Sequence, residues 1–407
     1  MRPVEIKKDI YWVGALDWNI REFHGYSTPK GTTYNAFLVI DEKIALFDTV
    51  KEPFKNDLIE SISKLIDPRR IDYLVVNHVE MDHSGAVPHI VEFVCPEKVV
   101  CSPMGKKALM DHYGRRDWPY HVVETGQTLD LGKKTINFIE TRMLHWPDSM
   151  MSYIPEDRLL FSSDGFGQHW ATSQRFDDEV DTSELLGHAA KYYANILLLF
   201  SPLVQKLIAK VVELGLDIDM IAPDHGLIWR KDPGAIIEAY RKWSRQESGR
   251  KALVIYDTMW QATRKMACAV AEGLKEGGLD FKLIDLKLNH RSDIMADLLD
   301  SRAVVLGSAT INNGMMPAMA DLLSYMKGLR PAGKIGAAFG SYGWSGEAVK
   351  LISEAMREIN IDLIGEGVRV KYSPVKEDLD MCVELGRQVA RAALDRQTGE
   401  LRTPAGT

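Results

Sequence analysis

Apolar and polar positions follow two different patterns along the chain, and the pattern changes near residue 245. Before that point most apolar runs are short and strand-like, for example at 33–40, 43–50, 71–78 and 135–140. Helical periodicity interrupts these runs at 54–66, 183–214 and 232–243. The last of these helices begins with Asp-Pro, a pair that favours a helix start. This half is therefore predicted to be a sandwich of sheets with helices outside.

After a polar stretch at 244–251, which we interpret as a linker, strand-like and helical segments alternate strictly. Strands are predicted at 252–258, 281–287, 303–310 and 334–343, and helices at 261–276, 293–299, 317–327, 346–358 and 377–394. This alternation predicts a doubly wound parallel sheet of five strands, with its ligand beyond the C-terminal ends of the strands. We therefore expect two domains, 1–249 and 250–407.

Composition and charge narrow the classes of function. A chain of 407 residues exceeds what one hydrophobic core usually organises. With 45% hydrophobic residues and a formal net charge of -7, it has no basic nucleic-acid footprint. The N-terminus lacks the apolar core of a signal peptide, and no apolar run approaches the length needed to span a bilayer. We expect a cytoplasmic protein without a nucleic-acid or membrane partner.

The stretch NHVEMDHSG, residues 77–85, concentrates metal-binding side chains directly after an apolar strand. It contains His78, Glu80, Asp82 and His83. A polar loop in which Asp82 caps the next helix is the alternative interpretation. Three further strand ends present His145, Asp164 and His225, and this repetition favours a metal site.

Three loops at strand ends of the second half suit a phosphate and a planar ring. The loop 258–263 has Thr258 and Thr263 at a helix N-terminus, where backbone N–H groups and hydroxyls bind phosphate. The loops 307–317 and 339–348 are rich in small residues, and the second adds Tyr342 and Trp344. The absence of G-x-G-x-x-G and G-K-[ST] argues against a dinucleotide or a P-loop nucleotide.

Together these motifs resemble the flavodiiron proteins, also called A-type flavoproteins, over about residues 5–395. The spacing H-x-E-x-D-H, with the later His, Asp and His, is similar to their version of the metallo-β-lactamase fold. Zinc hydrolases of that fold usually have a histidine where this chain has Glu80. Three carboxylates among seven candidate ligands suit iron better than a nitrogen-dominated zinc site would.

The resemblance implies the fold and the ligand sets. An αββα metallo-β-lactamase-like sandwich would precede a flavodoxin-like doubly wound parallel five-stranded sheet. One iron would be held by His78, Glu80 and His145, and the other by Asp82, His83 and His225, with Asp164 between them. Two metals bridged in this way lie roughly 3.5 to 4 Å apart. Neighbours that could orient ligands or supply protons are His24, Tyr26, Lys51, Trp146, Pro147 and His169, with His24 and Tyr26 favoured.

The resemblance also implies FMN in the second half. The first loop would hold the phosphate and the other two the isoalloxazine. The implied FMN-binding residues are Thr258, Met259, Trp260, Gln261, Ala262, Thr263, Ser308, Ala309, Thr310, Asn312, Asn313, Gly314, Ser341, Tyr342, Gly343, Trp344 and Gly346.

A flavin beside a two-metal site indicates an oxidoreductase, because hydrolysis needs no redox cofactor. The resemblance implies reduction of O2 to water, of NO to N2O, or of both. Rubredoxin or a similar small iron-sulfur protein would donate the electrons, since the C-terminal tail contains no C-x-x-C. It further implies a head-to-tail homodimer, or a pair of such dimers. The alternatives are a zinc hydrolase with an appended flavodoxin domain and an electron-carrier or gas-sensing module.

Overall fold

The computed structural model describes residues 2–115 and 117–396, which form two compact units. Unit 1 runs to Tyr192 and resumes at Pro202–Arg241. Unit 2 combines Tyr193–Ser201 with the chain from Lys242 onward. The last part of the tail on which the missing C-x-x-C was noted, 397–407, lies outside the described residues.

Unit 1 is built on two facing sheets. The first has the order β1 (Val4–Lys7), β2 (Ile10–Trp12), β7 (Phe37–Val39), β8 (Ala45–Phe47), β9 (Tyr73–Val76), β10 (Lys98–Cys101) and β11 (Tyr120–Val122). The second has the order β12 (Thr128–Asp130), β13 (Thr135–Glu140), β14 (Met150–Ile154), β15 (Leu159–Phe161) and β16 (Met220–Ala222). From β8 to β11 the first sheet is parallel, so the C-terminal ends of these strands share one edge.

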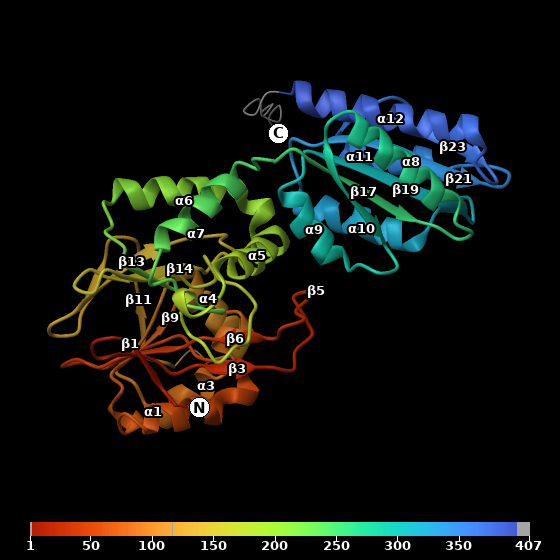
Figure 1. Ribbon diagram of the computed structural model, residues 1–407. Helices are drawn as coiled ribbons and strands as arrows, with labels where there is room; N and C mark the ends of the chain where they lie inside the picture. Colours follow the sequence, from red (N-terminus) through yellow and green to blue (C-terminus); the bar gives the residue numbers. More distant parts are fainter. Residues whose placement is uncertain (1, 116, 397–407) are drawn as a thin grey trace. The chain divides into compact units, whose positions relative to one another are not determined.

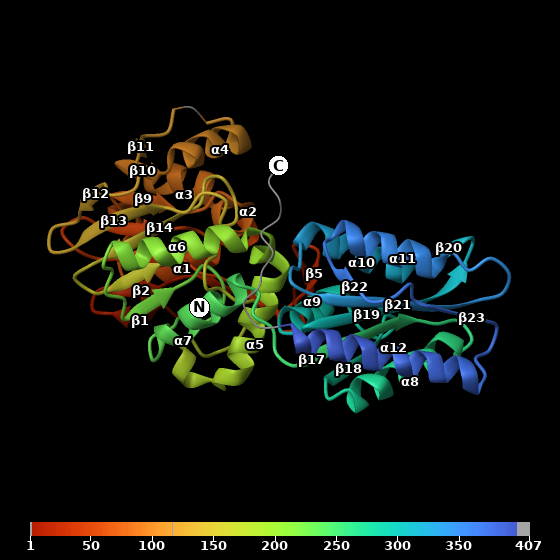
Figure 2. The same ribbon diagram turned by 90° about the horizontal axis from the view of Figure 1, so that it is seen from above.

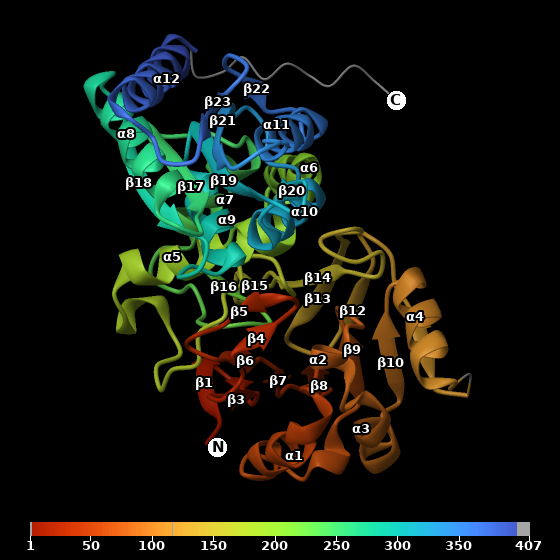
Figure 3. The ribbon, with the colours of Figure 1, turned by 90° about the vertical axis from the view of Figure 1, so that its right-hand side faces the viewer.

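One apolar core lies between the two sheets and a second lies under the outer helices. The first joins side chains of both sheets, including Phe37, Phe47, Phe138 and Phe161. The second packs the other face of the first sheet against α1 (Lys55–Ser63) and α3 (Val87–Val94). Figure 1 shows α1 and α3 on one outer side, and α6 (Ser201–Glu213) and α7 (Pro233–Ser244) on the other. In Figure 3, α4 (Pro103–Tyr113) lies beside β10. The predicted sandwich is confirmed.

The helical run Thr182–Glu213 is, among the described residues, the one stretch long and apolar enough to cross a membrane by length and composition. The expectation that no apolar run reaches that length is therefore wrong. The run consists of α5 (Thr182–Tyr192), a π-helical turn, a 3-10 turn and α6. It is weak evidence for a membrane span, because buried helices of globular proteins have the same composition.

Unit 2 is a parallel sheet in the order β18 (Asp280–Asp285), β17 (Lys251–Asp257), β19 (Ala303–Ile311), β21 (Ile335–Tyr342) and β22 (Asp362–Leu363). The short β23 (Val368–Lys371) also pairs with β21, and β20 (Gly314–Met315) pairs with β19. This is the flavodoxin-like strand order, with the first two strands exchanged. The predicted doubly wound sheet is confirmed.

Helices cover both faces of this sheet. Figure 2 shows α8 (Ala262–Glu276) and α12 (Lys376–Asp395) on one side, and α10 (Pro317–Leu329) and α11 (Ala348–Glu358) on the other. The α8 and α12 backbones approach so closely that a Cβ added to Gly273 would lie 1.9 Å from the Val383 carbonyl oxygen. A Cβ added to Gly386 would lie 2.2 Å from the Val270 carbonyl oxygen. Glycine at these two positions allows the helices to pack in contact.

A segment from the first half of the chain, Tyr193–Ser201, belongs to unit 2. Asn195 Nδ2 donates to the Ser292 carbonyl oxygen at 3.1 Å, and the Tyr325 hydroxyl donates to Asn195 Oδ1 at 2.8 Å. Ser292 lies in α9 (Arg291–Leu299) and Tyr325 in α10. The buried amide of Asn195 thus fixes this segment to two helices of unit 2.

Candidate metal centre and flavin site

Four loops of unit 1 carry the seven predicted metal ligands, each after a buried strand. The loop after β9 and the short helix α2 (Met81–Ser84) carry His78, Glu80, Asp82 and His83. The other loops carry His145 between β13 and β14, Asp164 after β15 and His225 after β16. The strands are apolar and buried on the sandwich core, so the polar side chains must gather where the strands end.

The structure brings all seven side chains together in two groups. In each group the donor atoms lie within 4.8 Å of one another. The groups are His78, Glu80, His145 and Asp164, and Asp82, His83 and His225. His24 also lies within the same distance of Glu80 and Asp82. The division matches the two ligand sets that the resemblance implied.

Asp164 lies between the two groups, with one carboxylate oxygen toward each. Its Oδ2 is 3.3 Å from His78 Nε2 and 3.1 Å from His145 Nε2. Its Oδ1 is 3.3 Å from His83 Nε2 and 3.6 Å from His225 Nε2. A carboxylate placed in this way can bind two metal ions at once.

Several of these donor atoms are buried without a hydrogen-bond partner. They are Asp82 Oδ1, Asp82 Oδ2, His83 Nε2, His145 Nε2, Asp164 Oδ2 and His225 Nε2. An unpaired buried polar atom costs about 1–3 kcal/mol, so a cluster of six that face one another requires a compensating partner. Bound cations are the partner that imidazole nitrogens and carboxylate oxygens share, and the residues present therefore fit a metal pair.

The electrostatics of the cluster also favour added positive charge. Burial lowers the pKa of His83, but the Asp82 and Asp164 carboxylates outweigh it and raise the pKa to about 10. Burial raises the pKa of Asp82, but His83 and His225 outweigh it and hold that pKa below its ordinary value. The carboxylates of this cluster thus stay anionic and stabilise positive charge beside them, whether on an imidazole or on a bound metal ion.

Hydrogen bonds to the outer ring nitrogens orient two of the candidate histidine ligands. His78 Nδ1 is 2.9 Å from Asp148 Oδ2, and His225 Nδ1 is 2.6 Å from the Thr33 carbonyl oxygen. These contacts direct the Nε2 atoms of both rings toward the cluster. Burial raises the pKa of Asp148, but the hydrogen bond and charge of His78 outweigh it, so the pKa is lowered and Asp148 stays anionic.

The buried Tyr192 of α5 donates its hydroxyl proton to Asp164 Oδ1 at 2.7 Å. Burial and the Asp164 charge raise the pKa of Tyr192 well above its ordinary value, so it remains a donor. Sequence reasoning missed Tyr192 and Asp148. Asp148 had a signal, because it lies three residues after His145 in the stretch LHWPDS.

The predicted neighbours lie at different distances from the cluster. His24 Nε2 is 2.8 Å from Glu80 Oε1, so His24 contacts a candidate ligand directly. The Trp146 ring centroid lies 5.3 Å from that of His78, and the His169 centroid 4.6 Å from that of His225. Tyr26 packs on His169 at 5.2 Å. Lys51 lies over the Phe23 and Tyr34 rings, at 5.6 and 6.0 Å.

In unit 2 the loop between β17 and α8 has the features of a phosphate site. Helix α8 begins at Ala262, after Gln261 in a left-handed conformation with φ of 66°, and no side chain caps its first N–H groups. Thr258 Oγ1 is buried without a hydrogen-bond partner. Thr263 Oγ1 lies 2.9 Å from Ser341 Oγ and joins this loop to the third. Free amides and hydroxyls at a helix N-terminus fit a phosphate group.

The other two predicted flavin loops follow the adjacent strands. Ser308, Ala309 and Thr310 are part of β19 rather than a loop, because the strand continues to Ile311 and pairs with β20. The turn that follows contains Asn312 and Asn313 at positive φ, and then Gly314.

Two indole rings lie at the same edge of the sheet, since β17, β19 and β21 are parallel. β21 ends at Tyr342, and Gly343, Trp344 and Gly346 follow it. Trp260 is 86% exposed and Trp344 is 84% exposed. Planar apolar rings left this open are suited to contact a flat aromatic ligand. The three loops thus fit the phosphate and ring of FMN.

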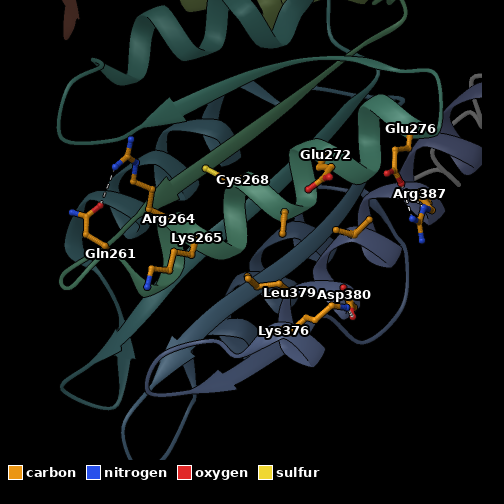
Figure 4. Close-up of a pocket in the computed structure, with 12 residues that line it drawn as sticks. Gln261, Arg264, Lys265, Cys268, Glu272, Glu276, Lys376, Leu379, Asp380 and Arg387 are labelled. Carbon is orange, nitrogen blue, oxygen red and sulfur yellow. Dashed lines mark hydrogen bonds and ion pairs between the residues drawn. The ribbon is translucent and has the colours of Figure 1, made fainter.

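A groove of about 930 Å³ lies elsewhere in unit 2, between α8 and α12 (Figure 4). Of the predicted flavin residues, only Gln261 lines it. Both basic and acidic side chains line it, including Lys265, Glu272, Lys376 and Asp380, and Cys268 is exposed among them. The groove and the candidate flavin site are therefore lined by different residues, apart from Gln261.

Comparisons with known proteins agree with both units. Residues 32–226 match the model of the ODP family beta lactamases, and residues 254–386 match the flavodoxin model. A nitric oxide reductase of Moorella thermoacetica is 51% identical over 97% of this chain and 100% of its own length. An anaerobic nitric oxide reductase flavorubredoxin of Escherichia coli is 39% identical, and the match covers 95% of this chain and 82% of that protein.

Solved structures extend the similarity to the whole chain. The rubredoxin oxygen:oxidoreductase of Desulfovibrio gigas is 44% identical, with a TM-score of 0.95 over 97% of this chain and 99% of that chain. The flavodiiron protein of Giardia intestinalis is 36% identical, with a TM-score of 0.93 over 97% of both chains. With relatives this similar along their full length, the chain belongs to the flavodiiron protein family.

Proposed function

We propose that this protein reduces O2 to water, NO to N2O, or both, at a non-haem diiron centre that receives electrons through FMN. The observation that carries the proposal is the carboxylate of Asp164, which lies between two groups of buried, unpartnered donor atoms. A flavodoxin unit in the same chain supplies the site for a redox cofactor, which a hydrolase does not need.

We assign His78, Glu80 and His145 to one iron and Asp82, His83 and His225 to the other, with Asp164 shared. Three carboxylates among the seven ligands favour iron over the nitrogen-rich zinc sites of hydrolases. Reduction of O2 to two waters takes four electrons and four protons, and reduction of two NO to N2O and water takes two electrons and two protons. FMN and the iron pair, when bound, would supply these electrons.

The surrounding side chains orient the ligands. His24 holds Glu80 from one side at 2.8 Å, and Tyr192 holds Asp164 from another at 2.7 Å. The rings of Phe23 and His169 pack around the same cluster, 5.0 Å apart. Burial of Asp82 and Asp164 strengthens the electrostatic attraction between these carboxylates and bound cations.

We assign FMN to the domain 250–407 and the diiron centre to the domain 1–249. The phosphate would bind the N–H groups at the start of α8 and the hydroxyls of Thr258 and Thr263. The isoalloxazine would contact Trp260, Tyr342 and Trp344, and the remaining contacts would come from Met259, Gln261, Ala262, Ser308, Ala309, Thr310, Asn312, Asn313, Gly314, Ser341, Gly343 and Gly346.

The decisive experiment combines metal analysis with gas consumption. We expect two irons and one FMN per chain, and consumption of O2, NO or both when reduced rubredoxin is supplied anaerobically. His78→Ala and Asp164→Ala should lose iron and both activities while keeping FMN, since the flavin residues lie in the other unit. Gas reduction without iron, or two zincs with hydrolytic turnover, would overturn the proposal.

For the electron donor we propose a separate rubredoxin-type protein, and for the site of action the cytoplasm. The names of two relatives, rubredoxin-oxygen oxidoreductase and flavorubredoxin, support the donor. When the oxidised, FMN-loaded protein is mixed anaerobically with reduced rubredoxin, the rate of FMN reduction should saturate with the donor concentration.

We further propose a head-to-tail homodimer, in which the FMN of one subunit serves the diiron centre of the other. A variant that is strictly monomeric by sedimentation should then keep both cofactors and lose turnover. The control is the rate of FMN reduction by the donor, which needs only one subunit and should not change. Full turnover in the monomer would exclude the dimer mechanism.

A further inference from the structure

The two candidate iron positions differ in how their histidines are supported. Asp148, only 2% exposed, accepts a hydrogen bond from His78 Nδ1 at 2.9 Å through its Oδ2. The same oxygen accepts the backbone N–H of Val79 at 2.7 Å. A full negative charge therefore lies directly behind one ligand of the position formed by His78, Glu80 and His145.

The position formed by Asp82, His83 and His225 has no such support. His225 Nδ1 faces the neutral Thr33 carbonyl oxygen at 2.6 Å. His83 Nδ1 is buried without a hydrogen-bond partner, and the nearby carboxylate oxygen, Asp224 Oδ2, is 3.9 Å away, beyond hydrogen-bond distance.

We propose that Asp148 is a positioning residue that makes the His78 position the tighter metal site of the pair. The inference rests on the proposed diiron centre and adds a ranking of its two metal positions by affinity. A carboxylate that accepts the ring N–H of a ligating histidine fixes its tautomer and increases the basicity of the opposite nitrogen. The His78 position gains both effects, whereas His225 gains only the fixed tautomer and His83 gains neither.

Asp148 also connects the two loops that supply this position. Its bond to the Val79 N–H fixes the backbone between His78 and Glu80. Asp148 itself follows His145 by three residues in the same loop. Ser102 Oγ donates to the Asp148 backbone carbonyl oxygen at 2.7 Å and anchors that loop. The buried carboxylate of Asp148 thus contacts one ligand, His78, and links the segment that carries Glu80 to the loop that carries His145.

The test is Asp148→Asn, which keeps the shape and an acceptor oxygen but removes the charge. Ferrous iron binding to the metal-free, FMN-loaded protein should be measured by anaerobic competition with a chelator. In the unmodified protein we expect two unequal affinities. In the variant the tighter one should weaken by about 10- to 100-fold while the weaker one stays unchanged. In Mössbauer spectra of the iron-loaded protein, only one of the two doublets should shift.

Asp217→Asn is the matched control, because it makes the same substitution in unit 1 at an exposed carboxylate that pairs with Arg158. It should leave the two affinities within about threefold of the original values, since the ligand contacts remain. A far-UV circular dichroism spectrum and an unfolding midpoint like those of the unmodified protein show that unit 1 of each variant is folded, and an FMN content of one per chain shows the same for unit 2. Equal weakening of both positions, or no weakening, in Asp148→Asn would refute the role of Asp148. An unmodified protein that binds no iron would instead overturn the proposed function.

Discussion

Lys334 is a fully buried lysine at the start of β21, 1% exposed. Its Nζ donates to the Ser301 carbonyl oxygen at 2.6 Å and to the Leu299 carbonyl oxygen at 3.4 Å. Burial lowers the pKa of the Lys334 ammonium to about 7, Asp300 opposes the shift and Arg302 adds to it. The folded protein therefore releases this proton at a lower pH than the unfolded chain does.

We predict that the stability of unit 2 rises with pH from about 7 to about 10. In that range the unfolded chain binds the Lys334 proton and the folded chain does not, so the free energy of unfolding gains about 1.4 kcal/mol per pH unit from this group. Below pH 7 both states bind the proton and the contribution is constant. Urea unfolding, followed by FMN release at several pH values, measures the slope.

Lys334→Met is the comparison for this prediction. It lacks the titrating group, so the difference in unfolding free energy between the two proteins should grow with pH over the same range. Titration of other residues is common to both proteins and cancels. Parallel pH profiles would show that Lys334 is charged in the folded state.

Some residues of the candidate centre could be identified from the sequence because their chemistry is local. His78, Glu80, Asp82 and His83 are metal-binding types directly after an apolar strand. Tyr192 could not be identified, because it reaches Asp164 from a helix 28 residues away and its sequence position gives no indication of that contact. Orienting partners depend on which distant segments pack together, and periodicity carries no information on that.

Helices α8 and α12 pack through glycines, although glycine weakens an isolated helix. Gly273 and Gly386 lie where a methyl group would overlap the carbonyl oxygens of Val383 and Val270. The helix pair covers one face of the sheet of unit 2. Leu385 and Val389 of α12 pack there in one apolar core with side chains of α8 and of the strands. The stability of unit 2 therefore depends on the close contact between the α8 and α12 backbones at these glycines.

Gly386→Ala should lower the free energy of unfolding of unit 2 by about 1–3 kcal/mol, because overpacking separates the helices. Gly328→Ala near the end of α10 is the control, since a Cβ there meets no atom within 4 Å. It should be neutral or stabilise by up to about 1 kcal/mol through helix propensity. Chemical unfolding of both variants measures the difference, and equal effects would contradict the packing argument.

Element types were predicted well in both halves, whereas their limits were not. The predicted loop 307–317 overlapped the predicted strand 303–310, and the structure assigns the shared residues to β19, which ends at Ile311 and pairs with β20. The stretch 183–214 was predicted as helical without a break. The structure inserts a π-helical turn at Tyr193–Leu197 and a 3-10 turn at Leu198–Phe200. Pairing and packing decide these limits, and neither is visible in a single periodic pattern.

The order of the two folds along the chain could be read from the change in pattern near residue 245. The points at which the backbone passes from one unit to the other could not be read from it. The backbone passes from one unit to the other after Tyr192, after Ser201 and again after Arg241. Helical periodicity shows that a face is apolar, but not which core buries it.

These three crossings have a consequence for synthesis of the protein. The ribosome delivers Asn195 before Ser292 and Tyr325, its hydrogen-bond partners, have been made. The nine residues Tyr193–Ser201 are therefore made before either unit is complete, and their partners follow only when α9 and α10 emerge. A cut that separates the two folds as continuous pieces either leaves this segment out of unit 2 or removes it from its partners there.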